Sequence, residues 1–198
     1  MDRRVRNDAS HRPGRQVCRA GQPIPATSVK TPVLQRAISF AARAHHGQFR
    51  KDGRTPYAAH PIRAAFTLQH LFGVRDESVL AAAVLHDTIE DTTTDYDELE
   101  REFGPQIAGL VACLTKDDRL PEDHREKLFD ERLAAAPWQA RLIKLADAYD
   151  NLLDSATSPR MASRALDRAR RALALAGDHI PEIANAKTAL VDLIEGQE

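Results

Sequence analysis

The chain has 198 residues, of which 42% are hydrophobic and 29% charged, so it can bury a core and is not disordered along its whole length. Its longest unbroken apolar run, residues 79–85, is far shorter than the roughly 20 residues of a membrane-spanning helix. A formal net charge of −1 argues against a dedicated nucleic-acid-binding protein, and Cys18 and Cys113 cannot build a disulfide framework. We therefore expect a cytoplasmic protein with no membrane or nucleic-acid partner.

The charge is unevenly distributed along the chain. Residues 1–30 hold seven Lys and Arg against two Asp and Glu, a balance of +5, which leaves −6 for residues 31–198. The first segment has scattered Pro and Gly and no apolar periodicity, which predicts a flexible basic arm over residues 1–30. Residues 31–198 are then the predicted domain.

The pattern from residue 31 onward is helical throughout. Apolar residues recur at helical spacing, and capping residues, Gly and Pro divide them into segments. The predicted helices cover about 31–45, 61–71, 76–89, 95–103, 105–114, 121–135, 137–153, 160–177 and 181–194. Residues 47–59 are predicted to form an ordered loop, and no segment alternates long enough to indicate a strand. The fold class is therefore all-α, with eight or nine helices.

A His-Asp pair follows the most apolar segment of the chain. His86 and Asp87 come directly after residues 79–85, so an apolar helix carries two polar side chains to the edge of the core. Buried polar groups need partners, and imidazole with carboxylate suits a divalent first-row metal. Taken alone, a simple hydrogen bond between the two residues is the better interpretation.

Two acidic residues, Glu90 and Asp91, follow this pair. On a continuous helix, Glu90 would share a face with His86, and Asp91 with Asp87, because each pair is four residues apart. Three acids within one and a half turns raise one another's pKa or recruit a cation. A solvated helix end is the alternative, but crowding directly after an apolar run favours a metal or general-base role.

Asp147 lies between apolar residues on a predicted buried helix, with Asn151 one turn later on the same face. A buried Asp is rarely unpaired, and a metal ion is one partner that stabilises it. A salt bridge to Lys144 or Arg141 is the alternative.

His60 stands at the end of a basic loop that contains Arg50 and Lys51. A lone His before a helix is usually a cap or a surface residue, whereas here it would be the second imidazole of a site. The basic residues could hold phosphate, and Arg50 could also stack on a base. By itself the loop could equally be a solvated turn.

The order His…His-Asp…Asp resembles that of the HD-domain metal-dependent phosphohydrolases, which are all-α. The match is sharper still to the hydrolase domain of the RelA/SpoT family, and the length is similar to that of its small single-domain members. The resemblance covers roughly residues 31–195 and rests on the segments RKDG (50–53), TPYAAHP (55–61), HDTIEDT (86–92), FG (103–104), KLAD (144–147) and NL (151–152).

This resemblance implies hydrolysis of guanosine 3′,5′-bis(diphosphate) at its 3′-diphosphate, with release of pyrophosphate and with Mn²⁺ as the metal. It implies one divalent cation held by His60, His86, Asp87 and Asp147. Glu90 and Asp91 match the acidic pair that positions or deprotonates the attacking water. Arg50, Lys51 and Asn151 match residues that contact the nucleotide.

Two other functions remain open at this point. Related hydrolases often carry an aromatic residue on the penultimate helix, and residues 164–176 contain none. Another 2′- or 3′-phosphorylated nucleotide, such as an adenosine alarmone or NADPH, is therefore an alternative substrate. A catalytically silent nucleotide-binding module is an alternative of another class, against which the intact set of candidate ligands argues.

Overall fold

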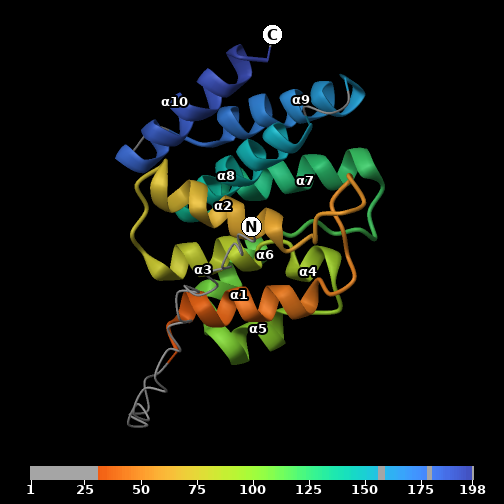
Figure 1. Cartoon of the computed structure of the whole chain (residues 1–198), viewed down its shortest axis with the longest axis vertical. Helices are drawn as coiled ribbons and strands as arrows, with labels where there is room; N and C mark the ends of the chain where they lie inside the picture. The colour runs from red at the N-terminus through yellow and green to blue at the C-terminus, as the bar shows by residue number, and fades with distance from the viewer. Residues whose placement is uncertain (1–30, 156–158, 178–179, 198) are drawn as a thin grey trace, which may run out of the picture. The chain divides into compact units, whose positions relative to one another are not determined.

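The computed structural model describes residues 31–155, 159–177 and 180–197, so the predicted basic arm lies outside the described residues. Within these ranges the chain is all-α, with nine helices of eight residues or more and a single helical turn, α4 (Figure 1). The bounds are α1 Val33–Ala44, α2 Ala59–His70, α3 Glu77–Leu85, α4 Thr88–Asp91, α5 Tyr96–Phe103, α6 Pro105–Leu114, α7 Glu122–Ala135, α8 Trp138–Asp154, α9 Pro159–Leu175 and α10 Pro181–Glu195. The predicted fold class is confirmed.

Helix α3 forms the apolar centre of this bundle. Every residue from Val79 to Leu85 is at most 2% exposed, because α3 packs against α1, α2, α6 and α8. Asp76 caps the helix as the sequence predicts: its carboxylate accepts a hydrogen bond from the backbone N–H of Ser78 at 2.8 Å. A helix that is apolar on all sides is stable only when other elements cover it completely.

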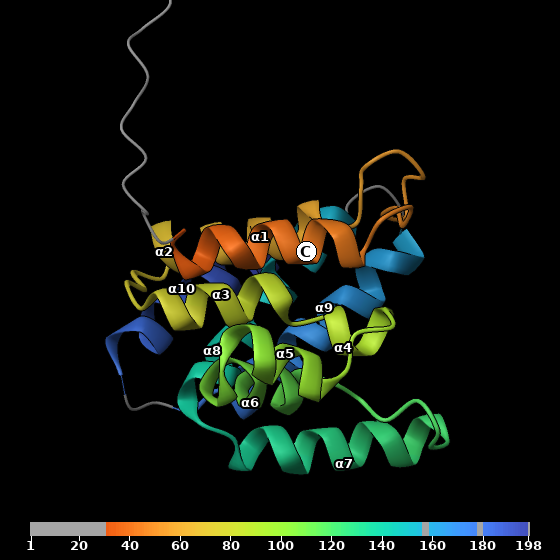
Figure 2. The same cartoon turned by 90° about the horizontal axis from the view of Figure 1, so that it is seen from below.

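Helix α8 is the second element around which the others are arranged. It packs against α2, α3, α6, α7, α9 and α10, and nine of its residues are buried. Figure 2 shows α7 on the opposite side of the described bundle from α1. Because α2, α3 and α8 contact one another pairwise, side chains from three distant parts of the sequence can meet where they join.

The predicted helix 76–89 is wrong in its extent, because α3 ends at Leu85 and α4 begins at Thr88. Two side chains occupy backbone carbonyls of the last turn of α3. His86 Nδ1 lies 2.7 Å from the carbonyl oxygen of Ala83, and the Thr88 hydroxyl donates to that of Leu85 at 2.7 Å. Side chains that bond to the backbone in this way compete with continuation of the helix.

The predicted loop before α2 is ordered. Phe49 and Pro56 form an isolated antiparallel bridge, and the Asp52 carboxylate accepts hydrogen bonds from the backbone N–H groups of Arg54 and Thr55. Gly53 adopts a φ of +68°, a left-handed conformation that favours glycine. The loop ends in α2, which begins two residues before the predicted Pro61.

In the described parts of the chain, no helix has the length and apolar character needed to cross a bilayer.

Removal of the Asp76 side chain tests its role as the N-cap of α3. Asp76→Ala deletes the acceptor for the Ser78 N–H, so we expect the free energy of unfolding to fall by about 1 kcal/mol. Urea unfolding followed by circular dichroism measures the change. Asp76→Asn is the matched control, because it keeps a side-chain oxygen at the cap and should retain most of the stability. An equal loss in both variants would contradict the capping role.

Candidate active site

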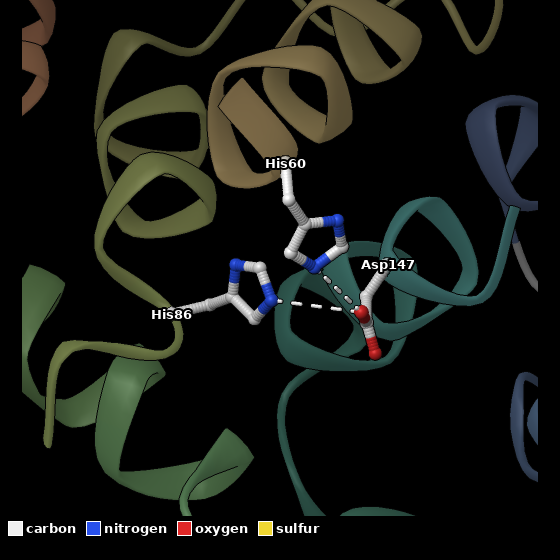
Figure 3. Close-up of side chains that lie close together, drawn as sticks. All are labelled: His60, His86 and Asp147. Atoms are coloured by element: carbon white, nitrogen blue, oxygen red, sulfur yellow. Dashed lines mark ion pairs between the residues drawn. The ribbon is translucent and has the colours of Figure 1, made fainter. Parts of the chain in front are cut away.

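Two histidines and an aspartate from three separate segments face a single point, with a second aspartate beside them. His60 lies in the first turn of α2, His86 follows α3, and Asp147 lies within α8. Figure 3 shows these three side chains pointing toward one another, and one potential ligand atom from each lies within 4.8 Å of the others. Asp87 lies beside them, with Oδ1 3.1 Å from His86 Nε2 and Oδ2 3.5 Å from His60 Nε2. The structure therefore brings together all four residues predicted as metal ligands.

The oxygen Oδ1 of Asp147 is shared between the two imidazoles. It lies 3.1 Å from Nε2 of His60 and 3.6 Å from Nε2 of His86 (Figure 3). The two rings meet edge to face, with their centroids 5.2 Å apart. Both Nε2 atoms are thus directed at the same carboxylate from different helices.

The hydrogen bond at Nδ1 of each imidazole determines whether Nε2 carries a lone pair. His60 Nδ1 lies 2.6 Å from a carboxylate oxygen of Asp150, and His86 Nδ1 lies 2.7 Å from the carbonyl oxygen of Ala83. Because these oxygens can only accept, Nδ1 carries a proton in both rings. The Nε2 atom of each neutral ring then presents a lone pair to the shared point.

The carboxylates make this point attractive to positive charge. Burial alone would lower the pKa of His60 and His86, but the neighbouring carboxylates, Asp147 foremost for His60 and Asp87 for His86, outweigh burial and raise both. Burial would raise the pKa of Asp147, but Lys144 and the two imidazoles hold it well below its usual range. A divalent cation at this point would take the place of the protons on the imidazoles.

The residues present fit such a cation. His86 Nε2 is buried and has no hydrogen-bond partner among the described residues, although two carboxylates lie within ion-pair distance. A buried nitrogen without a hydrogen bond is costly, and a metal ion would satisfy it. Two imidazoles and two carboxylates are a donor set that suits divalent first-row metals.

Asp147 also forms the salt bridge that the sequence left as an alternative. Its Oδ2 lies 2.6 Å from Lys144 Nζ, while its Oδ1 accepts from Asn151 Nδ2 at 2.5 Å. The two interpretations are therefore compatible, because one oxygen is neutralised by lysine and the other faces the imidazoles.

The acidic pair lies beside this cluster, but not for the reason its spacing indicated. Since α3 ends before His86, the four residues 86, 87, 90 and 91 do not share the faces of one continuous helix. The turn between α3 and α4 nevertheless keeps them close, and all four line one cavity of about 280 Å³.

Tyr57 and Lys116 hold the two acids in place. The Tyr57 hydroxyl lies 2.7 Å from Oδ2 of Asp87 and 2.7 Å from Oδ2 of Asp91, so one phenol joins a candidate ligand to a candidate base. Oε2 of Glu90 accepts a hydrogen bond from the backbone N–H of Lys116 at 2.9 Å. Partial burial, and after it the charges of Asp87 and Asp91, raise the pKa of Glu90 despite this hydrogen bond.

The candidate nucleotide-binding residues lie on another wall of the same cavity. Arg50 donates from Nη2 to Asn151 Oδ1 at 2.9 Å, and its guanidinium lies 5.4 Å from the centroid of the Tyr57 ring. Lys51 is exposed and lines the cavity beside Arg50. The structure thus joins Arg50 and Asn151 directly, and Asn151 in turn contacts Asp147.

Several residues of the site were not identified from the sequence. Helices α7 and α9 supply a cavity wall that includes Phe129, Ala165, Arg168, Arg171 and Ala172. A second cavity of about 480 Å³ is also lined by Arg50, Lys51, Asn151, Ala165 and Arg168. The resemblance pointed to the penultimate helix only through an aromatic residue that it lacks, and a helical pattern alone does not indicate which cavity a helix will cover.

Asp150 and Arg63 were also missed, although each carried a local signal. Asp150 directly precedes Asn151 on a predicted buried helix, where an acidic residue needs a partner. Arg63 follows His60 by three residues, a spacing that places both on one side of α2.

Comparison with known proteins identifies the family and the fold. The family model described as "HD domain" matches residues 37–174, which is more than half of the chain. A solved structure described as "A metazoan ortholog of SpoT hydrolyzes ppGpp and plays a role in starvation responses" superposes with a TM-score of 0.76 at 30% identity, covering 84% of this chain and 96% of that one.

Two curated relatives carry the name guanosine-3′,5′-bis(diphosphate) 3′-pyrophosphohydrolase MESH1. The protein of Homo sapiens is 48% identical over 122 residues, which cover 61% of this chain and 68% of that protein. The protein of Xenopus tropicalis is 42% identical over 123 residues, which cover 62% and 69%. The chain therefore belongs to the HD-domain family and groups within it with the small RelA/SpoT-type proteins.

Proposed function

We propose that this protein is a metal-dependent guanosine-3′,5′-bis(diphosphate) 3′-pyrophosphohydrolase. The observation that carries the proposal is the convergence of His60, His86, Asp87 and Asp147 on one buried point, beside an acidic pair and a basic wall. The named activity of the MESH1 relatives supports the choice of substrate.

The metal is Mn²⁺, held by His60 and His86 through Nε2 and by Asp87 and Asp147 through carboxylate oxygens. Their donor types and the lone pairs set by the two Nδ1 hydrogen bonds support a divalent first-row metal at this point, and the choice of Mn²⁺ rests on the resemblance to the RelA/SpoT hydrolases. A bound Mn²⁺ supplies Lewis-acid chemistry, because it polarises a phosphoryl oxygen and lowers the pKa of water.

Glu90 and Asp91 position the attacking water and accept its proton. The raised pKa of Glu90 makes it a stronger base than an exposed glutamate, and its hydrogen bond to the Lys116 N–H leaves Oε1 available. The Tyr57 hydroxyl holds Asp91 at a fixed distance from the ligand Asp87.

Arg50, Lys51 and Asn151 bind the nucleotide. Arg50 is held by Asn151 and can present its planar guanidinium to a base, whereas Lys51 offers a flexible point charge to phosphate. Their shared cavity with the metal cluster supports binding of one ligand across both groups.

The proposed reaction is hydrolysis of the bond between the 3′-oxygen and its phosphorus. Water attacks the phosphorus bonded to the 3′-oxygen and a new phosphorus–oxygen bond forms. The bond between that phosphorus and the 3′-oxygen breaks, so the 3′-oxygen is the leaving group and the attacked diphosphate is released as pyrophosphate. The proton lost by water passes to the acidic pair, and the 3′-oxygen takes up one proton. The other product is GDP, or GTP when the substrate carries a 5′-triphosphate.

A nucleotide panel tests the substrate. The Mn²⁺-loaded protein is incubated separately with guanosine 3′,5′-bis(diphosphate), its adenosine analogue and NADPH, and the products are separated by ion-exchange chromatography. We expect pyrophosphate and GDP from the guanosine compound. Pyrophosphate from the adenosine analogue or orthophosphate from NADPH, with the guanosine compound untouched, would contradict the substrate assignment. No turnover of any compound by metal-loaded protein would indicate a silent binding module.

Asp87→Ala tests the metal assignment. Asp87 supplies one of the two carboxylates, so we expect both metal binding and pyrophosphate release to fall to background. Isothermal titration with Mn²⁺ and a pyrophosphate assay measure the two quantities on the same sample. Asp97→Ala, which removes an exposed carboxylate on α5, is the control and should change neither. Full metal affinity in Asp87→Ala would remove Asp87 from the ligand set.

Glu90→Gln separates proton transfer from metal binding. The amide keeps the size of the side chain but cannot accept a proton, so we expect turnover to fall about 100-fold or more. Metal affinity should stay close to that of the unchanged protein, since Glu90 is not one of the four ligands. Steady-state kinetics and Mn²⁺ titration test both expectations. Near-normal turnover would move the role of general base to Asp91.

A further inference from the structure

A buried carboxylate lies directly behind one of the candidate metal ligands. His60 faces the metal point through Nε2, and its Nδ1 lies 2.6 Å from Oδ2 of Asp150. The side chains of His60 and Asp150 are only 1% and 3% exposed, so water has little room to replace this contact. Asp150 therefore holds the imidazole from the rear.

Arg63 holds Asp150 in turn. Its Nε donates to Oδ1 of Asp150 at 2.6 Å and its Nη2 donates to Oδ2 at 2.8 Å, which is the two-pronged geometry of a strong arginine–carboxylate pair. Both oxygens of Asp150 are engaged, so the carboxylate cannot rotate without breaking a charge-assisted hydrogen bond.

Arg63 also connects Asp150 to the cavity wall formed by Arg50, Lys51 and Asn151, which we call the nucleotide wall. Arg63 Nη2 lies 2.9 Å from Oδ2 of Asp154, and that oxygen also accepts from Arg50 Nε at 2.7 Å. A continuous series of charged groups therefore runs from His60 through Asp150, Arg63 and Asp154 to Arg50. Asp150 and Asp154 are one turn apart on α8, which allows Arg63 to reach both.

We propose that Asp150 and Arg63 are positioning residues that serve both halves of the active site. Asp150 keeps the proton of His60 on Nδ1 and thereby aims the Nε2 lone pair at the metal. Arg63 fixes Asp150 and, through Asp154, holds Arg50 at the nucleotide wall. This inference rests on the proposed function only for the nucleotide, because the effect on metal binding can be measured without substrate.

A purely structural salt bridge would behave differently. The Arg63 side chain is 40% exposed but Asp150 is only 3% exposed, so removal of Arg63 leaves a buried carboxylate without its two-pronged partner. If the pair only stabilised the fold, its removal would lower the free energy of unfolding and weaken metal binding and nucleotide binding together. A positioning role instead predicts separate losses, depending on which link of the chain is cut.

Asp150→Ala cuts the link to the metal ligand. We expect the dissociation constant for Mn²⁺ to rise about 10- to 100-fold, the usual effect of removing the carboxylate behind a metal-binding histidine. Titration calorimetry without nucleotide measures it, and excess Mn²⁺ should restore part of the turnover. Unchanged metal affinity in a folded Asp150→Ala protein would overturn the proposal.

Asp154→Ala removes the carboxylate that joins Arg63 to Arg50 and cuts only that link. We expect KM for the nucleotide to rise while the metal dissociation constant stays the same, because Asp154 contacts the two arginines and no candidate ligand. Parallel losses of metal affinity and nucleotide binding in this variant would contradict separate links.

Arg63→Gln keeps the test valid if Asp150→Ala does not fold, since the residue is partly exposed. It should weaken metal affinity and raise KM together, because Arg63 supports both ends of the chain. Arg36→Gln is the matched control: Arg36 is similarly exposed and pairs with Glu102 outside the active-site cavity, so neither quantity should change. Normal metal affinity and normal KM in Arg63→Gln would overturn the role of Arg63.

The two proposals fail in different ways. If the unchanged protein binds Mn²⁺ but releases no pyrophosphate, the proposed substrate is wrong, and the change in metal affinity of Asp150→Ala still decides the role of Asp150. If the unchanged protein is active and the variants retain both metal affinity and KM, the positioning role is wrong and the proposed function stands.

Discussion

The structure depends on one constraint: polar groups buried where α2, α3 and α8 meet must all find partners. Asp147 Oδ1 lies between the two imidazoles at the centre of this junction, and each surrounding group is anchored from behind. Each candidate ligand has a polar contact on the side away from the shared point. The two imidazoles contact Asp150 and the Ala83 carbonyl, and the two carboxylates contact Lys144 and Tyr57. Asp150 and Tyr57 reach their partners from distant segments, whereas Lys144 and Ala83 lie within one helical turn of theirs. Helix packing and local helix structure therefore set the geometry of the polar centre together.

The end of α3 shows how closely folding and chemistry are connected. The contact of His86 Nδ1 with the Ala83 carbonyl occupies a backbone acceptor in the last turn and accompanies the end of the helix. The same contact places the proton on Nδ1 and leaves Nε2 for the shared point. A residue without a donor at this position would lose both effects, so the local structure of the chain and the orientation of a candidate ligand have one physical cause.

Apolar periodicity was sufficient to predict an all-α fold with nearly correct helix bounds, because amphipathic helices leave a direct record in sequence. Asp147 and His86 stood out as polar residues within or beside apolar runs, but the set of four candidate ligands came from the resemblance to the HD-domain order. The continuous helix through residue 89 was wrong because its end depends on side-chain hydrogen bonds that a periodic pattern does not contain. The partners Arg63, Asp150 and Tyr57 were not found because long-range pairing is decided by helix packing, which no local pattern records.

The acidic character of residues 31–198 is compatible with an anionic substrate, because basic side chains lie at one wall of the cavity and carboxylates lie around the candidate metal point. Lys144 and Lys116 are neutralised by Asp147 and Glu126 at 2.6 Å, so they stabilise the acids of the site. Lys51 is exposed at the cavity and makes no ion pair within the described residues, whereas Arg50 is fixed by Asp154 and Asn151. A divalent cation between Asp87 and Asp147 would make the local charge positive at the end of the cavity that these carboxylates line. The proposed binding of the nucleotide therefore depends on the proposed metal, because Lys51 lies at the cavity wall and the phosphate to be cleaved would lie among carboxylates.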